Sequence, residues 1–220
     1  MRQFRSGAQG NSPGLGHVQF RMRIPTLTLV LLLAACTLSE AQAKREPILG
    51  GPCEGCEWVF DGMPAKLDWA GRIAPANEPG TPMRIDGVVR DRDGKPAAGI
   101  IVYAYQTDAG GLYPSGPNRH GRLRGWVRTD ANGRYRFETI RPGGYPNTTI
   151  PQHVHMHVIE PGRGTYYIDD IVFTDDPRLT PEQRKSHVTG RGGNGLVTPK
   201  RDSDGRLLVT RDIALGAQVR

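Results

Sequence analysis

Apolar and polar positions alternate over short segments from about residue 83 onward, and turn-forming residues separate these segments. Valine, isoleucine and aromatic residues are concentrated in them, which is typical of half-buried β-strands. The pattern predicts strands over residues 84–90, 99–106, 123–129, 134–140, 153–159, 166–173 and 206–214. Short strands at this spacing indicate a β-sandwich, so the predicted fold class is all-β.

Turn and capping residues add detail to this pattern. Asn132-Gly133 lies between two predicted strands and is a strong signal for a hairpin turn. One short helix is predicted over residues 180–185, because Thr180 can cap it and Pro181 suits its first position. The chain holds 29 Gly and 18 Pro, which favours a turn-rich β protein over a helical bundle.

The pattern divides the chain into three regions. Residues 1–43 have the features of an export signal, residues 44–82 form an irregular arm that carries a cysteine pair, and residues 83–220 form the β-sandwich domain. The export signal has basic residues, then the apolar run 27–35, then small residues ending at Ala43. We therefore expect a periplasmic or secreted protein without a transmembrane helix in its mature form.

A second way of processing the N-terminus competes with simple export. Leu33-Ala34-Ala35-Cys36 resembles a lipoprotein box, in which the signal ends at Ala35 and Cys36 becomes a lipid anchor. Simple export is slightly favoured over this membrane-anchored lipoprotein.

The positive net charge suggests a nucleic-acid partner at first sight, but the distribution of the charges argues against one. The formal charge of the chain is +7, and removal of residues 1–43 would lower it to about +4, because four arginines and Glu40 leave with them. The remaining basic residues are scattered among carboxylates, so no basic face is expected.

Cys53 and Cys56 form an even pair in Gly51-Pro52-Cys53-Glu54-Gly55-Cys56. In an oxidising compartment this pair predicts a local disulfide. A zinc site would need two further ligands close by, and a thioredoxin-like redox site would need a βαβ pattern. The sequence shows neither.

Three of the six histidines alternate with apolar residues in the predicted strand 153–159. Side chains of a strand alternate between its faces, so His153, His155 and His157 share one face and leave the other for the core. This pattern is typical of a metal site. A solvated strand face is one alternative, and a zinc or copper site made of all three histidines is another.

Two tyrosines lie in loops rather than in strand patterns, and such residues are positioned by their turns. Tyr113 follows Gly110-Gly111, and Tyr145 stands between Gly144 and Pro146. A phenol has a pKa near 10, so a tyrosine ligand requires a strong Lewis acid such as iron(III). Two phenolates, two imidazoles and one hydroxide would bring iron(III) to zero net charge, which lowers the cost of burial.

The sequence around these histidines and tyrosines resembles the intradiol ring-cleavage dioxygenases, the family of the protocatechuate and catechol dioxygenases. The resemblance covers about residues 85–177, and its motifs stand in the family's order. They are Asp86-Gly87-Val88-Val89, Tyr105-Gln106-Thr107-Asp108, Arg124-Gly125-Trp126-Val127-Arg128-Thr129-Asp130, Gly133-Arg134-Tyr135-Arg136-Phe137, Thr139-Ile140-Arg141-Pro142-Gly143-Gly144-Tyr145-Pro146, His153-Val154-His155 and Ile171-Val172-Phe173.

The resemblance implies an oxidoreductase of aromatic catabolism with non-haem Fe(III) bound by Tyr113, Tyr145, His153 and His155. It further implies that a catechol-type substrate displaces the axial Tyr145, which is the catalytic residue, and that O2 is the second substrate. The ring would then open between its two hydroxylated carbons. Family members assemble into oligomers, so a homo-oligomer is also an expectation.

The sequence departs from the family at the position three residues before His153. Members usually carry an arginine there, thought to stabilise the developing charge of the substrate, and this chain has Ile150. The groups that could replace this arginine are Arg119, Arg122, Arg141 and Gln152. His157 is expected to be a neighbour of the metal and not a ligand.

A different class of protein shares the same pattern of strands and turns. Non-catalytic β-sandwich modules of the transthyretin or carboxypeptidase-regulatory kind also show it, and a shared fold does not settle function. Tyr113 together with His153 and His155 favours the enzyme, because a structural module has no need of them.

Overall fold

The computed structural model describes residues 45–219 except residues 52 and 54. Residues 45–220 form one compact unit. The predicted export segment and Cys36 lie outside the described residues, and so does the proposed lipid anchor. No helix within the described part of the chain is long and apolar enough to cross a membrane.

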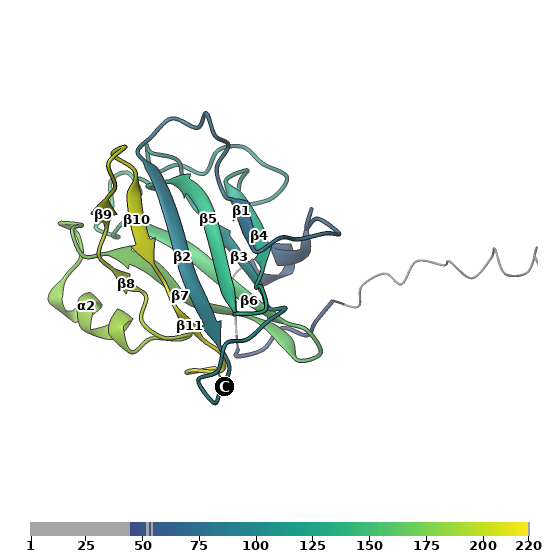
Figure 1. Ribbon diagram of the computed structural model, residues 1–220. Helices are drawn as coiled ribbons and strands as arrows, with labels where there is room; N and C mark the ends of the chain where they lie inside the picture. Colours follow the sequence, from purple (N-terminus) through teal and green to yellow (C-terminus); the bar gives the residue numbers. More distant parts are fainter. Residues whose placement is uncertain (1–44, 52, 54, 220) are drawn as a thin grey trace, which may run out of the picture. The chain divides into compact units, whose positions relative to one another are not determined.

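Two β-sheets make up the fold, so the prediction of an all-β sandwich is confirmed (Figure 1). The first sheet has the strand order β1-β5-β2-β10-β9, and β11 also pairs with β2; the second has the order β4-β3-β6-β7-β8. The strands of the first sheet are β1 (Ala70–Arg72), β2 (Pro82–Arg90), β5 (Arg134–Ile140), β9 (Lys200–Arg201), β10 (Leu207–Thr210) and β11 (Ile213–Ala214). Those of the second are β3 (Ile101–Tyr105), β4 (Arg124–Arg128), β6 (His153–Glu160), β7 (Gly164–Phe173) and β8 (Leu196–Val197).

The core lies between the two sheets, and alternation along the strands builds it. Ile85 of β2 and Phe137 of β5 are opposite each other in the first sheet and are fully buried. Val102 of β3 and Val154 of β6 contribute to the same core cluster from the second sheet. Successive side chains of a strand point to opposite faces, so the residues between these core positions lie on the outer faces of the sandwich.

The predicted strand 206–214 is divided into β10 and β11, and both pieces pair with β2 in parallel. The division falls at Arg211, whose side chain is fully buried and donates hydrogen bonds to the carbonyl oxygens of Gly192 and Asp212. A buried guanidinium needs hydrogen-bond acceptors, and backbone carbonyl oxygens provide them here. The strand is interrupted at the same place. Alternation in the sequence could not reveal this interruption.

The arm contains more regular structure than predicted. The 3-10 helix η2 (Cys56–Phe60) and strand β1 both lie within it, and β1 pairs in parallel with β5. Val59 of η2 is fully buried in a second apolar cluster with Tyr103 and Tyr105 of β3, on the face of the second sheet away from the core. The arm therefore covers the outer face of the sheet that carries the histidines.

The predicted helix is present as α2 (Pro181–Val188). Thr180 accepts a hydrogen bond from the backbone N–H of Gln183, and the Gln183 side chain accepts one from the N–H of Thr180. This capping box satisfies two donors at the start of the helix.

Candidate metal centre

The three histidines of β6 lie on the outer face of the second sheet, as the alternation predicted. His155 is paired with Tyr105 of β3, and His157 is paired with Tyr103. Tyr105 also stacks on the His155 ring, with 4.5 Å between the ring centroids. The strand thus presents imidazoles toward the arm and the loops that cover this face.

Two loops bring the tyrosines to the histidines. The loop of Tyr113 is held by Asp108, whose carboxylate accepts hydrogen bonds from the backbone N–H groups of Gly110 and Leu112. Gly111 has a φ of 82°, and a Cβ at this position would lie 2.1 Å from the carbonyl oxygen of Gly144. Only glycine permits this backbone conformation and this close approach, so the two loops that carry Tyr113 and Tyr145 pack directly together.

The predicted ligand atoms converge on one point. The hydroxyl oxygens of Tyr113 and Tyr145 are 2.7 Å apart. Tyr145 Oη lies 3.2 Å from His153 Nε2 and 3.4 Å from His155 Nε2, and the two Nε2 atoms are 3.1 Å apart. The structure therefore brings together all four predicted site residues, which lie up to 42 positions apart in the sequence.

The opposite nitrogen of each ring fixes which atom faces the centre. His153 Nδ1 lies 2.7 Å from the carbonyl oxygen of Pro151, which can only accept a hydrogen bond, so this nitrogen carries the proton. His155 Nδ1 lies 3.0 Å from the Asp170 carboxylate and donates to it in the same way. Both Nε2 atoms then turn unshared electron pairs toward each other and toward the phenols.

This arrangement fits a bound cation. Two electron pairs directed at each other across 3.1 Å repel, and a metal ion between the nitrogens converts that repulsion into coordination. Burial lowers the pKa of His153, assisted by the neighbouring His155, so its imidazole is kept neutral as a metal ligand requires. Burial and the hydrogen bond with Tyr145 raise the pKa of Tyr113, so this phenol ionises only where a strong positive charge is bound.

Asp170 is a site residue that the sequence analysis missed. Its carboxylate is also close enough to His153 and His155 to suggest a site of two histidines and one carboxylate. His155 presents Nδ1 to Asp170 and Nε2 to His153, however, and one metal ion cannot bind both sides of the ring. Asp170 therefore supports His155 from behind. Burial alone would raise the pKa of Asp170, but its interactions with His155 outweigh burial and hold the pKa below its usual range.

A β-bulge brings Asp170 to His155. Val154 of β6 faces Ile171 of β7, but Met156 faces Ile168, so β7 has one extra residue between these pairs. Bulges redirect side chains in this way and are common beside active sites. The sequence carried the signal, because two polar residues stand together between Ile168 and Ile171 and break the alternation.

A cavity of about 590 Å³ opens beside the four atoms. Tyr113, Tyr145 and His155 form part of its wall, and Trp58 of the arm forms another part. Its lining includes further aromatic and polar groups, namely Tyr105, Arg119, His120, His157, Tyr167, Asp169, Asp170 and His187. The cavity is large enough for a small aromatic molecule.

Arg119 is the one arginine among the described residues that line the cavity. Of the other groups considered as replacements, Arg122 forms an ion pair with Glu78 and Arg141 forms one with Asp175. The side chain of Ile150 is 45% exposed, and it does not line the cavity. Among the arginines proposed from the sequence, Arg119 is therefore the one that lines the cavity.

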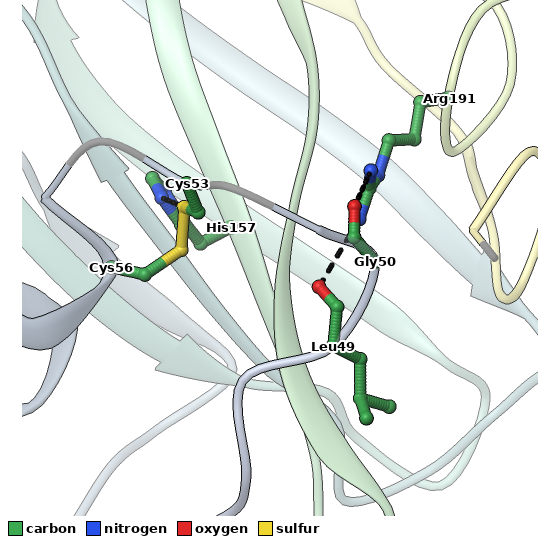
Figure 2. Close-up of a disulfide and its surroundings, with 6 residues drawn as sticks. All are labelled: Leu49, Gly50, Cys53, Cys56, His157 and Arg191. Carbon is green, nitrogen blue, oxygen red and sulfur yellow. Dashed lines mark hydrogen bonds between the residues drawn. A yellow bond between two sulfur atoms is a disulfide. The ribbon is translucent and has the colours of Figure 1, made fainter.

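The predicted disulfide between Cys53 and Cys56 is present, with 5.6 Å between the two Cα atoms. It lies at the cavity wall beside His157, whose Nε2 is 3.6 Å from Cys53 Sγ (Figure 2). His157 therefore faces the cysteines and not the tyrosines. The alternative of a metal site made from all three histidines of β6 does not match this geometry.

Comparison with known proteins places this geometry in a family context. The family model described as "Dioxygenase" matches residues 60–204, about two thirds of the chain. The protocatechuate 3,4-dioxygenase beta chain of Burkholderia cepacia is 33% identical over 129 residues, which are 49% of this chain and 54% of that protein. Catechol 1,2-dioxygenase 1 of Acinetobacter lwoffii is 40% identical over 118 residues, which are 48% of this chain and 36% of that protein. The matches thus span about half or less of these two relatives.

Solved structures show the same fold. The dioxygenase domain of a dioxygenase–carbohydrate-binding fusion protein from Streptomyces sp. SirexAA-E superposes with a TM-score of 0.52 at 25% identity, over 71% of this chain and 94% of that one. 3-Chlorocatechol 1,2-dioxygenase of Rhodococcus opacus 1CP gives a TM-score of 0.55 at 18% identity, over 84% of this chain and 76% of that one.

Proposed function

The chain belongs to the intradiol ring-cleavage dioxygenase family, and on this premise we propose that it is a non-haem iron(III) enzyme that opens a catechol-type ring. Cleavage falls between the two hydroxylated carbons, and O2 is the second substrate. The observation that carries this proposal is the convergence of Tyr113 Oη, Tyr145 Oη, His153 Nε2 and His155 Nε2 on one point beside a cavity.

The donor set fits iron(III) better than the common alternatives. Iron(II) and zinc sites usually combine histidine with carboxylate or cysteine ligands, whereas two phenols suit a trivalent ion that can ionise them. Tyr113, Tyr145, His153 and His155 would hold the ion. When bound, iron(III) supplies the Lewis acidity that ionises the diol and makes its ring reactive toward O2.

Tyr145 has the role of a proton acceptor in this proposal. Its oxygen is close to Tyr113 and to both histidines, and Tyr145 also lines the cavity from which a diol arrives. A tyrosine phenol and a catechol hydroxyl have similar acidity, so Tyr145 Oη, ionised when the metal is bound, could take one proton from the entering substrate. Tyr113, His153 and His155 would continue to hold the metal.

The remaining groups of the cavity bind and orient the ring. The Arg119 guanidinium lies 5.7 Å from the centroid of the Trp58 ring at the cavity wall, where its positive charge can face the developing negative charge of the substrate. Trp58 comes from η2 of the arm, and the arm therefore completes the binding site.

Isotope labelling tests the proposed reaction. Iron-loaded protein incubated with catechol and isotopically heavy O2 should form an open-chain dicarboxylic acid that contains both labelled oxygen atoms. Tyr113→Phe should form none of this product. Product that carries a single labelled atom, or no product from protein that holds its full iron content, would contradict the proposal.

We also propose that the mature protein works outside the cytoplasm. The Cys53–Cys56 disulfide supports this, because structural disulfides form in oxidising compartments. The test is the location of the full-length protein in a cell fractionation, with the chain lacking residues 1–43 as the control.

A further inference from the structure

His157 is a buried histidine that the proposed iron centre does not use. Its side chain is 2% exposed, and its Nδ1 has no hydrogen-bond partner among the described residues. Its Nε2 faces Cys53 Sγ at 3.6 Å (Figure 2). A disulfide sulfur is only a weak hydrogen-bond acceptor. The buried imidazole is therefore poorly satisfied, which is energetically unfavourable, and its packing alone does not explain why a histidine stands here.

The two cysteines and His157 form a group with the composition of a metal site. One potential ligand atom from each of Cys53, Cys56 and His157 lies within 4.8 Å of the other two. We propose that reduction of the disulfide turns this group into a second metal site, which binds a thiophilic cation such as zinc(II). Two thiolates and one imidazole would hold the ion, and the fourth tetrahedral position would face the cavity that Cys53 and His157 line.

A dithiol reductant can supply the electrons and protons that open the disulfide. The reductant gives two electrons and two protons to the S–S bond and becomes a disulfide itself. The Cys53 and Cys56 thiols then release their two protons as zinc(II) binds the sulfur atoms. His157 contributes its Nε2, which already faces Cys53 Sγ at 3.6 Å.

Contacts outside the disulfide hold the segment before the cysteines in place. Arg191 donates hydrogen bonds to the carbonyl oxygens of Gly50, at 2.9 Å, and Leu49, at 3.4 Å (Figure 2). The Leu49 N–H donates to the carbonyl oxygen of Thr165 at the start of β7. These bonds do not involve sulfur, so Cys53 stays near His157 when the S–S bond is open.

The second cysteine is held just as firmly. Cys56 is fully buried at the start of η2, and the indole N–H of Trp126 donates to the carbonyl oxygen of Val59 in the same helix at 2.7 Å. Gly55 precedes it with a φ of 80°, and a Cβ at Gly55 would lie 2.3 Å from His120 Nε2. Gly55 therefore packs closely on the His120 side chain, and we expect both thiols to stay beside His157 after reduction.

Cobalt(II) binding tests the proposal, because thiolate coordination gives cobalt an intense near-ultraviolet charge-transfer band that the tyrosine–histidine centre cannot produce. A phosphine can replace the dithiol as reductant, because it takes oxygen from one water molecule, becomes the phosphine oxide and leaves two thiols. Wild-type protein reduced in this way should develop the band and bind one extra equivalent of cobalt. Oxidised wild-type protein should do neither. Zinc(II) added afterwards should displace the cobalt and remove the band.

Two substitutions locate the site. Cys53→Ser should abolish the band, and His157→Phe should weaken zinc binding to the reduced protein by at least about tenfold. His187→Phe is the matched control, since His187 is a histidine of α2 outside the group, and it should leave zinc affinity unchanged.

Three results would overturn the proposal. One is a reduced wild-type protein that shows no band, and another is a band that Cys53→Ser leaves intact or a zinc affinity that His157→Phe leaves unchanged. The third is loss of the cooperative thermal transition on reduction, because a site needs the frame that positions it. The wild-type comparison needs no substitution, and none of the readouts depends on ring cleavage, so the proposed function is tested separately.

Discussion

His155 Nδ1 lies 3.0 Å from the Asp170 carboxylate, and the opposite nitrogen of the same ring faces His153 and Tyr145. A carboxylate in this position orients the imidazole and increases its electron donation to a metal. The low pKa of Asp170 keeps the carboxylate charged at neutral pH.

Asp170→Asn should therefore weaken iron binding by about tenfold to a hundredfold while the protein remains folded. An amide can still accept a hydrogen bond from Nδ1 but cannot balance positive charge on the ring. The measurement is competition for iron against a chelator, followed by the position of the visible absorption band. Asp169→Asn is the control, because among the described residues Asp170, and not Asp169, is the carboxylate that pairs with His155. Equal iron affinity in wild type and Asp170→Asn would contradict this role.

Iron-loaded protein should be red to brown. A tyrosinate donates charge from its filled π orbitals into the half-filled d shell of iron(III), whereas zinc, with a full d shell, gives no such colour. Tyr113→Phe should abolish or strongly shift the band, because it removes the ligand oxygen and keeps the ring. His157→Phe should leave the colour largely intact. Colourless protein with full iron content would rule out the phenolate ligands.

Substrate should change this colour in two steps. Catechol added without oxygen should move the band to longer wavelength as the diol takes the place of Tyr145. Oxygen admitted afterwards should bleach the new band as the ring opens. Stopped-flow absorbance measures both steps. A band whose wavelength does not change when catechol is added without oxygen would show that the diol does not reach the centre.

Beyond the proton that a bound water loses as it becomes hydroxide, iron binding should release about two protons at neutral pH, one from each phenol. Burial raises the pKa of Tyr113, so this phenol is protonated before the metal arrives, whereas the lowered pKa of His153 means that this ring has no proton to lose from Nε2. Iron affinity should therefore rise with pH through the neutral range and fall as the medium becomes acidic. Proton release can be measured with an indicator dye in weak buffer, after correction for the iron chelator. Tyr145→Phe should reduce the release to about one proton, and an unchanged count would exclude Tyr145 as a ligand.

Arg119→Leu should lower kcat/KM for catechol by about tenfold to a hundredfold, since it removes the cavity's arginine. Iron content and colour should stay unchanged, because Arg119 is not among the ligands. Steady-state kinetics and metal analysis together check this. Arg122→Leu is the matched control, because that guanidinium is paired with Glu78. If both variants behave like wild type, positive charge from arginine does not assist the reaction.

Ile150→Arg tests the departure from the family pattern. The exposed Ile150 side chain does not line the cavity, so an arginine there has to reach inward to help. A gain in turnover on simple catechols, in protein that is folded and iron-loaded, would show that the family's position is still functional. No gain would fit the assignment of this role to Arg119.

The sequence by itself determined most of the long strands and the face on which the histidines lie, and it pointed to the four residues proposed as ligands. Period-two alternation fixes which side chains of β6 share a face, and glycine and proline fix where Tyr113 and Tyr145 lie in their loops. These signals are local, so each can be recognised within its own segment without information on tertiary contacts.

Only the tertiary structure decided which groups support that centre. Asp170 reaches His155 through a bulge whose effect depends on the pairing of β6 with β7, and Cys53 reaches His157 across 104 positions of sequence. Arg119 reaches the cavity wall only through the packing of its loop against the arm, beside Trp58. Such contacts depend on packing between segments that are distant in the sequence. The sequence pattern within one segment does not change when these contacts form, so it cannot reveal them.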